Sequence, residues 1–296
     1  MILARGLLIL ACATGLADPA ERLPATRPLS GDGDLSRAML DGLHRFAERR
    51  IDASVGARVK LWDRDTSSRS AYEKSVGRNR ASFRRIIGAV DPRLPARMER
   101  FGGDDDPALV AECDTFRAYQ VRWPVLEGVC GEGLVLEPRG EVAGRVVVVP
   151  DADQTPEQMA GLAPGVAPRS QLARRLAARG FRVVVPTLVS RGIEFSGSPR
   201  IAMTNQPHRE WVYRQAYQMG RHVIGYEVQK VLAAVDWIKK EVGPEAKVGV
   251  AGYGEGGLIA FYAAASDPRI DAALVSGYFG PRQRVWAEPI YRNVWG

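Results

Sequence analysis

The sequence has few histidines and cysteines, and beyond its first twenty residues it has no long apolar run. Three His and three Cys stand in 296 residues. Without a later apolar run of about 20 residues, none of the later segments is expected to cross a bilayer. Basic residues are interleaved with acids and form no block with aromatics, which argues against nucleic acid as a partner. The 46% hydrophobic and 25% charged content is that of a globular chain with a sizeable core.

The first residues have the pattern of an export signal. Arg5 precedes a short apolar run at residues 6–14, and small residues follow as a cleavage site. We expect a signal peptide over residues 1–17 and a flexible lead over residues 18–30, which predicts a secreted or periplasmic protein. Cys12 also fits a lipoprotein box; a lipid anchor there is the less favoured alternative and the one membrane contact we consider.

The other two cysteines, Cys113 and Cys130, have two possible states. In an oxidising compartment they could form a disulfide. They could equally remain as two free thiols, and the sequence leaves both possibilities open.

Two kinds of pattern follow each other along the chain. Residues 31–112 carry helical periodicity and predict a helical N-terminal segment, with helices over 32–54 and 68–89. Residues 113–296 predict an α/β domain, because a hairpin (118–138) is followed by apolar strands that alternate with helices. Such strands form a mostly parallel sheet with helices on both faces. We expect strands at 145–150, 182–188, 247–253 and 270–280, and helices at 170–180, 222–243 and 256–268.

In a parallel sheet, ligands bind beyond the C-terminal ends of the strands. The informative loops are therefore those that follow Pro150, Leu188, Tyr253 and Ser276.

The stretch GYGEGG, residues 252–257, follows an expected strand and fits two motifs. One is the dinucleotide-binding pattern G-x-G-x-x-G. It is disfavoured because residues 272–279 lack the partner acid and because Glu255 would place a carboxylate in the phosphate loop. The other is the nucleophile elbow G-x-S-x-G, a sharp strand-to-helix turn. That motif requires Ser, Cys or Asp at position 254, where this chain has glycine.

The segments KVGVAGYGEGG and AAASDPRIDAALVSG resemble the α/β-hydrolase superfamily, nearest to its dienelactone-hydrolase and acetyl-xylan-esterase-like branch. The resemblance covers about residues 115–296. It implies an α/β-hydrolase fold and ester or lactone hydrolysis as the ancestral chemistry. It makes Gly254 a vacant nucleophile position. It also makes the backbone N–H of Glu255, with one N–H from the loop around Asp151, Ala152 and Asp153, the donors of an oxyanion hole.

The same resemblance leaves the acid and histidine of a catalytic triad unfilled. Triads in this fold run nucleophile, acid, histidine along the chain, but His44, His208 and His222 all precede position 254. The last expected strand would also be an exposed apolar edge, which proteins normally avoid. We therefore expect a fold truncated after the strand that follows the elbow, and a chain that is an N-terminal fragment. A missing tail would explain the absent acid and histidine but not Gly254.

The loop over residues 189–223 is the main candidate for ligand binding. It follows a strand, so it should overhang the ligand edge as a cationic, aromatic lid that suits an anionic or sugar-like ligand. The alternative is a structural insertion whose arginines pair with local acids. The expected ligand-binding residues are Asp151, Ala152, His208, Arg209, Trp211, Arg221 and His222.

Glu255 has two possible roles. It could act as a general base on water at the vacant position, or it could be an acid favoured by the dipole at a helix N-terminus. Asp151 and Asp153 lack the further ligands that a metal site needs. We expect no metal and no cofactor.

Three hypotheses follow. The first is an exported α/β-hydrolase-family protein that has lost its serine-esterase chemistry and binds a small ester or saccharide-like ligand. The second is an active ester hydrolase completed by a missing C-terminal part, with an unusual nucleophile or a water activated by Glu255. The third is a dinucleotide-binding domain.

Overall fold

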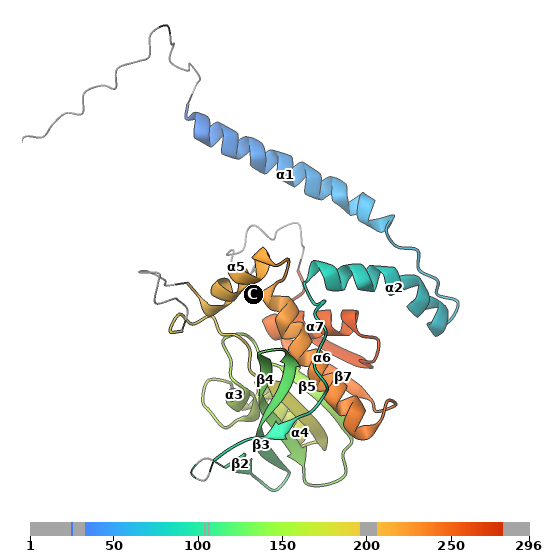
Figure 1. Ribbon diagram of the computed structural model, residues 1–296, viewed down its shortest axis with the longest axis vertical. Helices are drawn as coiled ribbons and strands as arrows, with labels where there is room; N and C mark the ends of the chain where they lie inside the picture. The colour runs from blue at the N-terminus through green and yellow to red at the C-terminus, as the bar shows by residue number, and fades with distance from the viewer. Residues whose placement is uncertain (1–24, 26–32, 104, 106, 196–205, 281–296) are drawn as a thin grey trace, which may run out of the picture. The chain divides into compact units, whose positions relative to one another are not determined.

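The computed structural model describes residues 25, 33–103, 105, 107–195 and 206–280 (Figure 1). The predicted signal peptide and, apart from Ala25, the predicted lead lie outside these residues. The chain divides into two compact units, residues 1–54 and 55–296. Among the described residues, no helix combines the length and the apolar character needed to cross a membrane.

The first unit contains most of helix α1 (Leu35–Val59), which confirms the helix expected there. The helix begins after Asp34, whose Oδ1 accepts the N–H of Ser36 at 2.7 Å in the manner of an N-cap. None of its residues is buried. The apolar side chains predicted to share one face, Met39 and Phe46 among them, are exposed.

In the second unit, α2 (Arg69–Ile86) lies against the sheet domain. Ser68 caps it by accepting the N–H of Ala71 at 3.1 Å, as the serine-rich start of the expected helix suggests. The rings of Phe83 and Tyr262 meet edge to face at 4.9 Å, which packs α2 on α7 (Glu255–Ser266).

The prediction that the helical segment extends to residue 112 is wrong. The chain after α2 forms β1 (Glu99–Arg100) and β2 (Leu109–Glu112), and both pair antiparallel with β3 (Phe116–Leu126). Elements of two and four residues are too short to show a period in the sequence, and their pairing partner is distant in the chain. The sheet therefore begins earlier in the sequence than expected.

The second unit is built around one mixed sheet of eight strands. The path order is β1-β3-β4-β6-β5-β7-β8, with β2 paired to β3. The predicted hairpin is confirmed as β3 and β4, which pair from Phe116↔Pro138 to Leu126↔Val129. The predicted parallel strands form the other half of the sheet, whereas β4 joins β6 antiparallel. The remaining strands are β4 (Val129–Pro138), β5 (Gly144–Val149), β6 (Phe181–Pro186), β7 (Val248–Tyr253) and β8 (Ala272–Ser276).

Helices cover both faces of this sheet (Figure 1). On one face, α6 (Val223–Val242) and α7 bury side chains such as Val231 and Ile259 against Val147. On the other face, α3 (Pro156–Ala160) and α4 (Leu172–Ala177) pack against Val148 and Val183. A short 3-10 helix (Pro168–Ser170) precedes α4, and α5 (His208–Gln218) precedes α6. This arrangement confirms the expected α/β-hydrolase architecture.

Two further expectations about the second unit are resolved. Among the described residues, β8 pairs with β7 alone and Leu274 is exposed, so β8 is the apolar edge that the sequence predicted. Cys113 and Cys130 are both exposed free thiols, which settles the alternative between pairing and free thiols.

Candidate functional site

The turn from β7 into α7 has the geometry expected of an elbow. Gly254 stands at the turn with φ of 59° and ψ of −122°, in the left-handed region that side chains rarely adopt. A Cβ on Gly252 would lie 2.1 Å from the carbonyl oxygen of Gly256, and a Cβ on Gly256 would lie 2.1 Å from that of Val149. Gly252 and Gly256 therefore allow α7 to cross close to the strands, because a side chain at either position would clash with the backbone.

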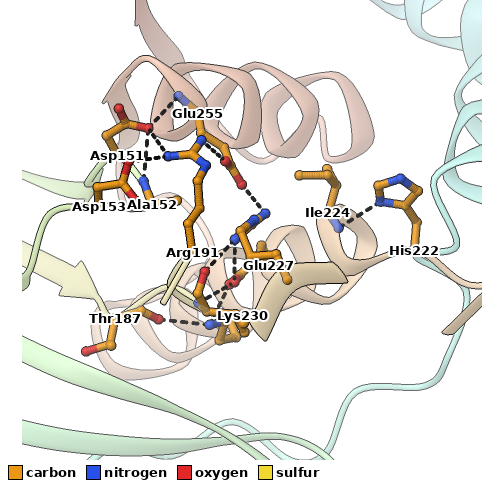
Figure 2. Close-up of polar contacts among 12 residues, drawn as sticks. Asp151, Ala152, Asp153, Thr187, Arg191, His222, Ile224, Glu227, Lys230 and Glu255 are labelled. Atoms are coloured by element: carbon orange, nitrogen blue, oxygen red, sulfur yellow. Dashed lines mark hydrogen bonds and ion pairs between the residues drawn. The ribbon is translucent and has the colours of Figure 1, made fainter. Parts of the chain in front are cut away.

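The Asp151 carboxylate lies in front of this turn (Figure 2). Its Oδ1 accepts the N–H of Ala152 at 2.9 Å and the N–H of Glu255 at 3.1 Å. The Glu255 N–H is the oxyanion-hole donor that the sequence resemblance implied, and Ala152 lies in the loop from which the second donor was expected. Both N–H groups point at one position. The point is occupied by a carboxylate oxygen of the protein itself.

Arg191 connects the acids of the site. It lies in the loop after β6, and its Nη2 is 2.6 Å from Oε2 of Glu255. Its Nη1 is 2.7 Å from Oδ2 of Asp153 and 3.8 Å from Oδ1 of Asp151. Figure 2 shows the guanidinium between these carboxylates. Sequence reasoning grouped Arg191 with the lid but did not single it out, although its place directly after a strand at the ligand edge was a usable signal.

Glu255 is buried at the start of α7 and is held by two arginines. Oε1 forms a short ion pair with Nη2 of Arg209, and Oε2 pairs with Arg191. Burial raises the pKa of Glu255 to about 7, against the opposing effect of the Arg209 and Arg191 charges. The carboxyl group therefore exchanges its proton near neutral pH, but it faces cations of the protein rather than an open position.

Below Glu255, charged side chains continue into the interior. Arg209 and Glu227 are both 0% exposed, with Nη1 of Arg209 3.5 Å from Oε1 of Glu227. Arg209 also donates to the carbonyl of Val189 at 2.7 Å. Glu227 accepts the Val189 N–H at 2.8 Å and pairs with Lys230 at 2.5 Å. Lys230 in turn donates to the carbonyl of Thr187 at 2.8 Å. The network ties α5 and α6 to the loop after β6.

This network corrects one prediction and adds two residues. Arg209 was expected on a ligand-facing lid, but its guanidinium is inside the protein. Glu227 and Lys230 were not singled out, because charges on an amphipathic helix normally face solvent. Only the packing of the loop after β6 over α6 shows that these two are enclosed.

His208 was expected to bind a ligand, and the structure gives it local partners. Its Nε2 accepts the Phe195 N–H at 2.8 Å, and its Nδ1 is 2.8 Å from Oγ of Ser190. Because Nε2 is an acceptor, a neutral ring carries its proton on Nδ1 and donates to the serine. A base that activates Ser190 would need the opposite arrangement. In this arrangement the Ser190–His208 pair joins the loop after β6 to the start of α5.

The other lid candidates also have structural partners. Arg221 forms two bonds of 2.7 Å to the Asp91 carboxylate. His222 caps α6, with Nδ1 accepting the Ile224 N–H at 3.0 Å, and in Figure 2 this pair lies to one side of the Glu255 cluster. Trp211 is half-buried on α5. In the part of the chain that the structure describes, no group of three or more His, Cys, Asp or Glu could hold a metal ion.

Comparison with protein families identifies the fold's relatives. The model of the dienelactone hydrolase family matches residues 132–291, more than half of the chain. This chain belongs to the dienelactone hydrolase family. The finding confirms the resemblance seen in the sequence, and it agrees with the sheet and helix order described above. A comparison with curated proteins gave no match.

Several solved structures are similar to this chain at low sequence identity. A Bacteroides fragilis protein assigned as an acetyl xylan esterase shares 17% identity with a TM-score of 0.51, over 74% of this chain and 58% of that one. Acetyl xylan esterase 1 of Thermoanaerobacterium shares 18% identity with a TM-score of 0.45, over 72% and 68%. Glucuronoyl esterase of Solibacter usitatus shares 12% identity with a TM-score of 0.48, over 77% and 67%. The chain thus spans about three fifths of the Bacteroides protein's length, and that likeness shows the fold alone.

Proposed function

We propose that this dienelactone-hydrolase-family protein lacks serine-esterase chemistry and binds a small ester or saccharide-like ligand at the C-terminal ends of β5, β6 and β7. The observation that carries the proposal is the pairing of Gly254 with the Asp151 carboxylate. A glycine at the elbow offers no oxygen or sulfur for a covalent step. A carboxylate oxygen on the two N–H groups prevents them from stabilising the oxyanion of a bound ester.

Ligand binding at this edge is supported by the polar groups gathered there. The loops after β5 and β6 bring Asp153, whose side chain is 64% exposed, together with Arg191. Carboxylates and a guanidinium are the donors and acceptors that ester carbonyls and sugar hydroxyls require. Family membership supports the ester class, and the Bacteroides neighbour's assignment motivates acetylated xylo-oligosaccharides as the first ligands to test.

The test combines a turnover assay with a binding assay. We expect no hydrolysis of p-nitrophenyl acetate above the buffer rate, and measurable calorimetric binding of acetylated xylo-oligosaccharides. Arg191→Gln should weaken that binding, whereas Arg214→Gln, which alters an exposed arginine of α5, should not. Hydrolysis of p-nitrophenyl acetate by the wild-type protein would contradict the loss of ester chemistry. If none of the acetylated xylo-oligosaccharides bound, the binding role would be contradicted.

A second candidate is ester hydrolysis by a water that Glu255 activates. The pKa of about 7 that burial gives Glu255 favours it, because a general base works best when its pKa lies near the working pH. The ion pairs with Arg191 and Arg209 argue against it, because they occupy both carboxylate oxygens. If the wild type hydrolyses p-nitrophenyl acetate and Glu255→Gln does not, this candidate replaces the first.

Export of the protein stays a prediction of its first residues. Comparing the N-terminal residue of protein recovered outside the cytoplasm with the expected cleavage after Ala17 tests it.

A further inference from the structure

The two oxygens of the Asp151 carboxylate are in different situations. Oδ1 is held by the N–H groups of Ala152 and Glu255. Oδ2 accepts no hydrogen bond within the described residues, and the side chain is 27% exposed. A Cβ built on Gly254 would lie 3.0 Å from Oδ2. The unbonded oxygen therefore lies beside the position from which an elbow residue would project.

This arrangement determines which tetrahedral centre the two N–H groups could stabilise. They are hydrogen-bonded to an oxygen on Cγ of Asp151, so a substrate carbonyl cannot use them at the same time. They would, however, stabilise negative charge that develops on Oδ1 if a nucleophile added to Cγ. The nearby Arg191 Nη1, 3.8 Å from Oδ1, adds positive charge at that point. The site is thus complementary to the hydrolysis of an ester formed on Asp151 itself.

We infer that Asp151 supplies the nucleophile that position 254 lacks, and that it acts on a saturated carbon that bears a leaving group. In the first step Oδ2 attacks that carbon, a carbon–oxygen bond forms, and the leaving group departs as an anion with the bonding electron pair. The product is an alkyl ester of Asp151. This reaction rests on the ligand site proposed above and adds chemistry to it.

In the second step water adds to Cγ of the Asp151 ester. The oxyanion forms on Oδ1, where the Ala152 and Glu255 N–H groups meet it. Collapse of this intermediate releases the alkoxide, which takes one of the two water protons. The other proton passes to solvent, and the Asp151 carboxylate is restored. The net reaction converts an alkyl compound with its leaving group and water into an alcohol and an acid. It needs no oxidant, reductant or cofactor.

A structural role for Asp151 is the competing explanation, since an acid at the start of a helix is also favoured by the dipole. The two explanations differ in the fate of the carboxylate oxygens. A nucleophile exchanges them with solvent oxygen during turnover, whereas a structural acid does not. A nucleophilic Asp151 also predicts its substrate class. The two N–H groups are already bound to Asp151, so they are not available to stabilise acyl attack on p-nitrophenyl acetate.

The experiment uses the full chain with n-butyl bromide as the probe, in water enriched in oxygen-18. Bromide release is followed over time, and mass spectrometry of the peptide that contains Asp151 then measures the incorporation of oxygen-18. Asp151→Asn keeps an acceptor for the two N–H groups but removes the nucleophile. Glu157→Gln is the control, because it removes an exposed carboxylate on α3, which follows the same loop but lies outside the proposed ligand site. Thermal unfolding shows that each variant is folded.

We expect the wild type and Glu157→Gln to release bromide and to carry oxygen-18 at Asp151. Bromide release by Asp151→Asn should fall by roughly 1,000-fold or more, the scale of removing a catalytic nucleophile. The inference is overturned if the wild type releases no bromide, if release survives in Asp151→Asn, or if the Asp151 peptide stays unlabelled during turnover. Ligand binding is measured separately by calorimetry, so a negative result for bromide release does not decide the binding proposal.

Discussion

The carboxyl group of Asp151 lies where a side chain at position 254 would begin. A Cβ on Gly254 would be 3.0 Å from Cγ and Oδ2 of Asp151 and 3.2 Å from Oδ1. Contacts at this distance are tighter than side chains normally tolerate, so the glycine and the carboxylate depend on each other. The glycine at position 254 and the Asp151 carboxylate on the two N–H groups are therefore one structural feature.

This dependence predicts a stability loss for Gly254→Ser. Side chains at positive φ cost on the order of 1–3 kcal/mol, and the Asp151 contact adds to that cost. Gly220→Ser is the control, because Gly220 also has a positive φ, 64°, but a Cβ placed on it would meet no atom within 4 Å. Urea unfolding should show a larger loss at 254 than at 220. The additional loss of stability at position 254 should become smaller when Asp151→Ala is combined with Gly254→Ser. Equal losses of stability for Gly254→Ser and Gly220→Ser would contradict the contact with Asp151.

Removal of Arg209 should destabilise the protein strongly. Arg209→Met leaves Glu255 and Glu227 buried beside fewer cations, and breaking a buried pair by removing one partner typically costs about 3–5 kcal/mol. Arg214→Met is the matched control on the same helix, because its side chain is 62% exposed and pairs only at the surface with Glu210. Surface changes of that kind are usually within about 0.5 kcal/mol. Similar free energies of unfolding for the two variants would disprove a structural role for the buried network.

The raised pKa of Glu255 predicts how its contribution to stability depends on pH. In the unfolded chain the carboxyl group has its ordinary pKa of 4.5, and in the folded protein burial raises the pKa to about 7. Between these values the folded protein holds the proton more tightly, so this group's contribution is complete in acid. It is lost as pH rises through about 7.

Comparison with Glu255→Gln isolates this effect. The free energy of unfolding of the wild type, relative to the variant, should fall by at most about 3 kcal/mol from pH 4.5 to pH 7. Glu132→Gln, a change at a half-exposed acid on the sheet, should show no such trend. A relative stability that rises over this pH range would mean that the arginines, rather than burial, control the ionisation of Glu255.

The Arg221–Asp91 pair should connect the start of α6 with the segment after α2. Its two bonds of 2.7 Å give it the bidentate geometry that makes exposed ion pairs measurable. A double-mutant cycle of Arg221→Ala and Asp91→Ala should give a coupling free energy of about 1 kcal/mol. The same cycle on Arg37 and Asp41, an exposed pair within α1, should give about 0.3–0.5 kcal/mol. Equal coupling free energies in the two cycles would contradict the proposed connection between α6 and the segment after α2.

The sequence alone predicted the α/β half of the fold closely. Its Val-rich strands alternate with helices, so β5, β6 and β7 are recognisable from local period, and the glycines at 252 and 256 mark the close strand–helix turn. The family followed from the same stretch. The convergence of the Glu255 and Ala152 N–H groups could also be expected, because backbone donors at strand ends depend on the fold and not on side-chain identity.

Only the tertiary structure decided what fills the site. The positions of Asp151, Arg191 and Arg209 depend on how the loops after β5 and β6 and helix α5 meet at one edge of the sheet. The period of the sequence does not predict such a long-range contact. The sequence suggested that Arg209 lies on a ligand-facing lid, because a charged residue gives no sign of its burial. It suggested that His222 binds a ligand, whereas His222 caps a helix. The sequence determined that position 254 has no nucleophile. The packing of the loop after β5 against the start of α7 decided that a carboxylate takes its place, because that contact joins residues about a hundred positions apart.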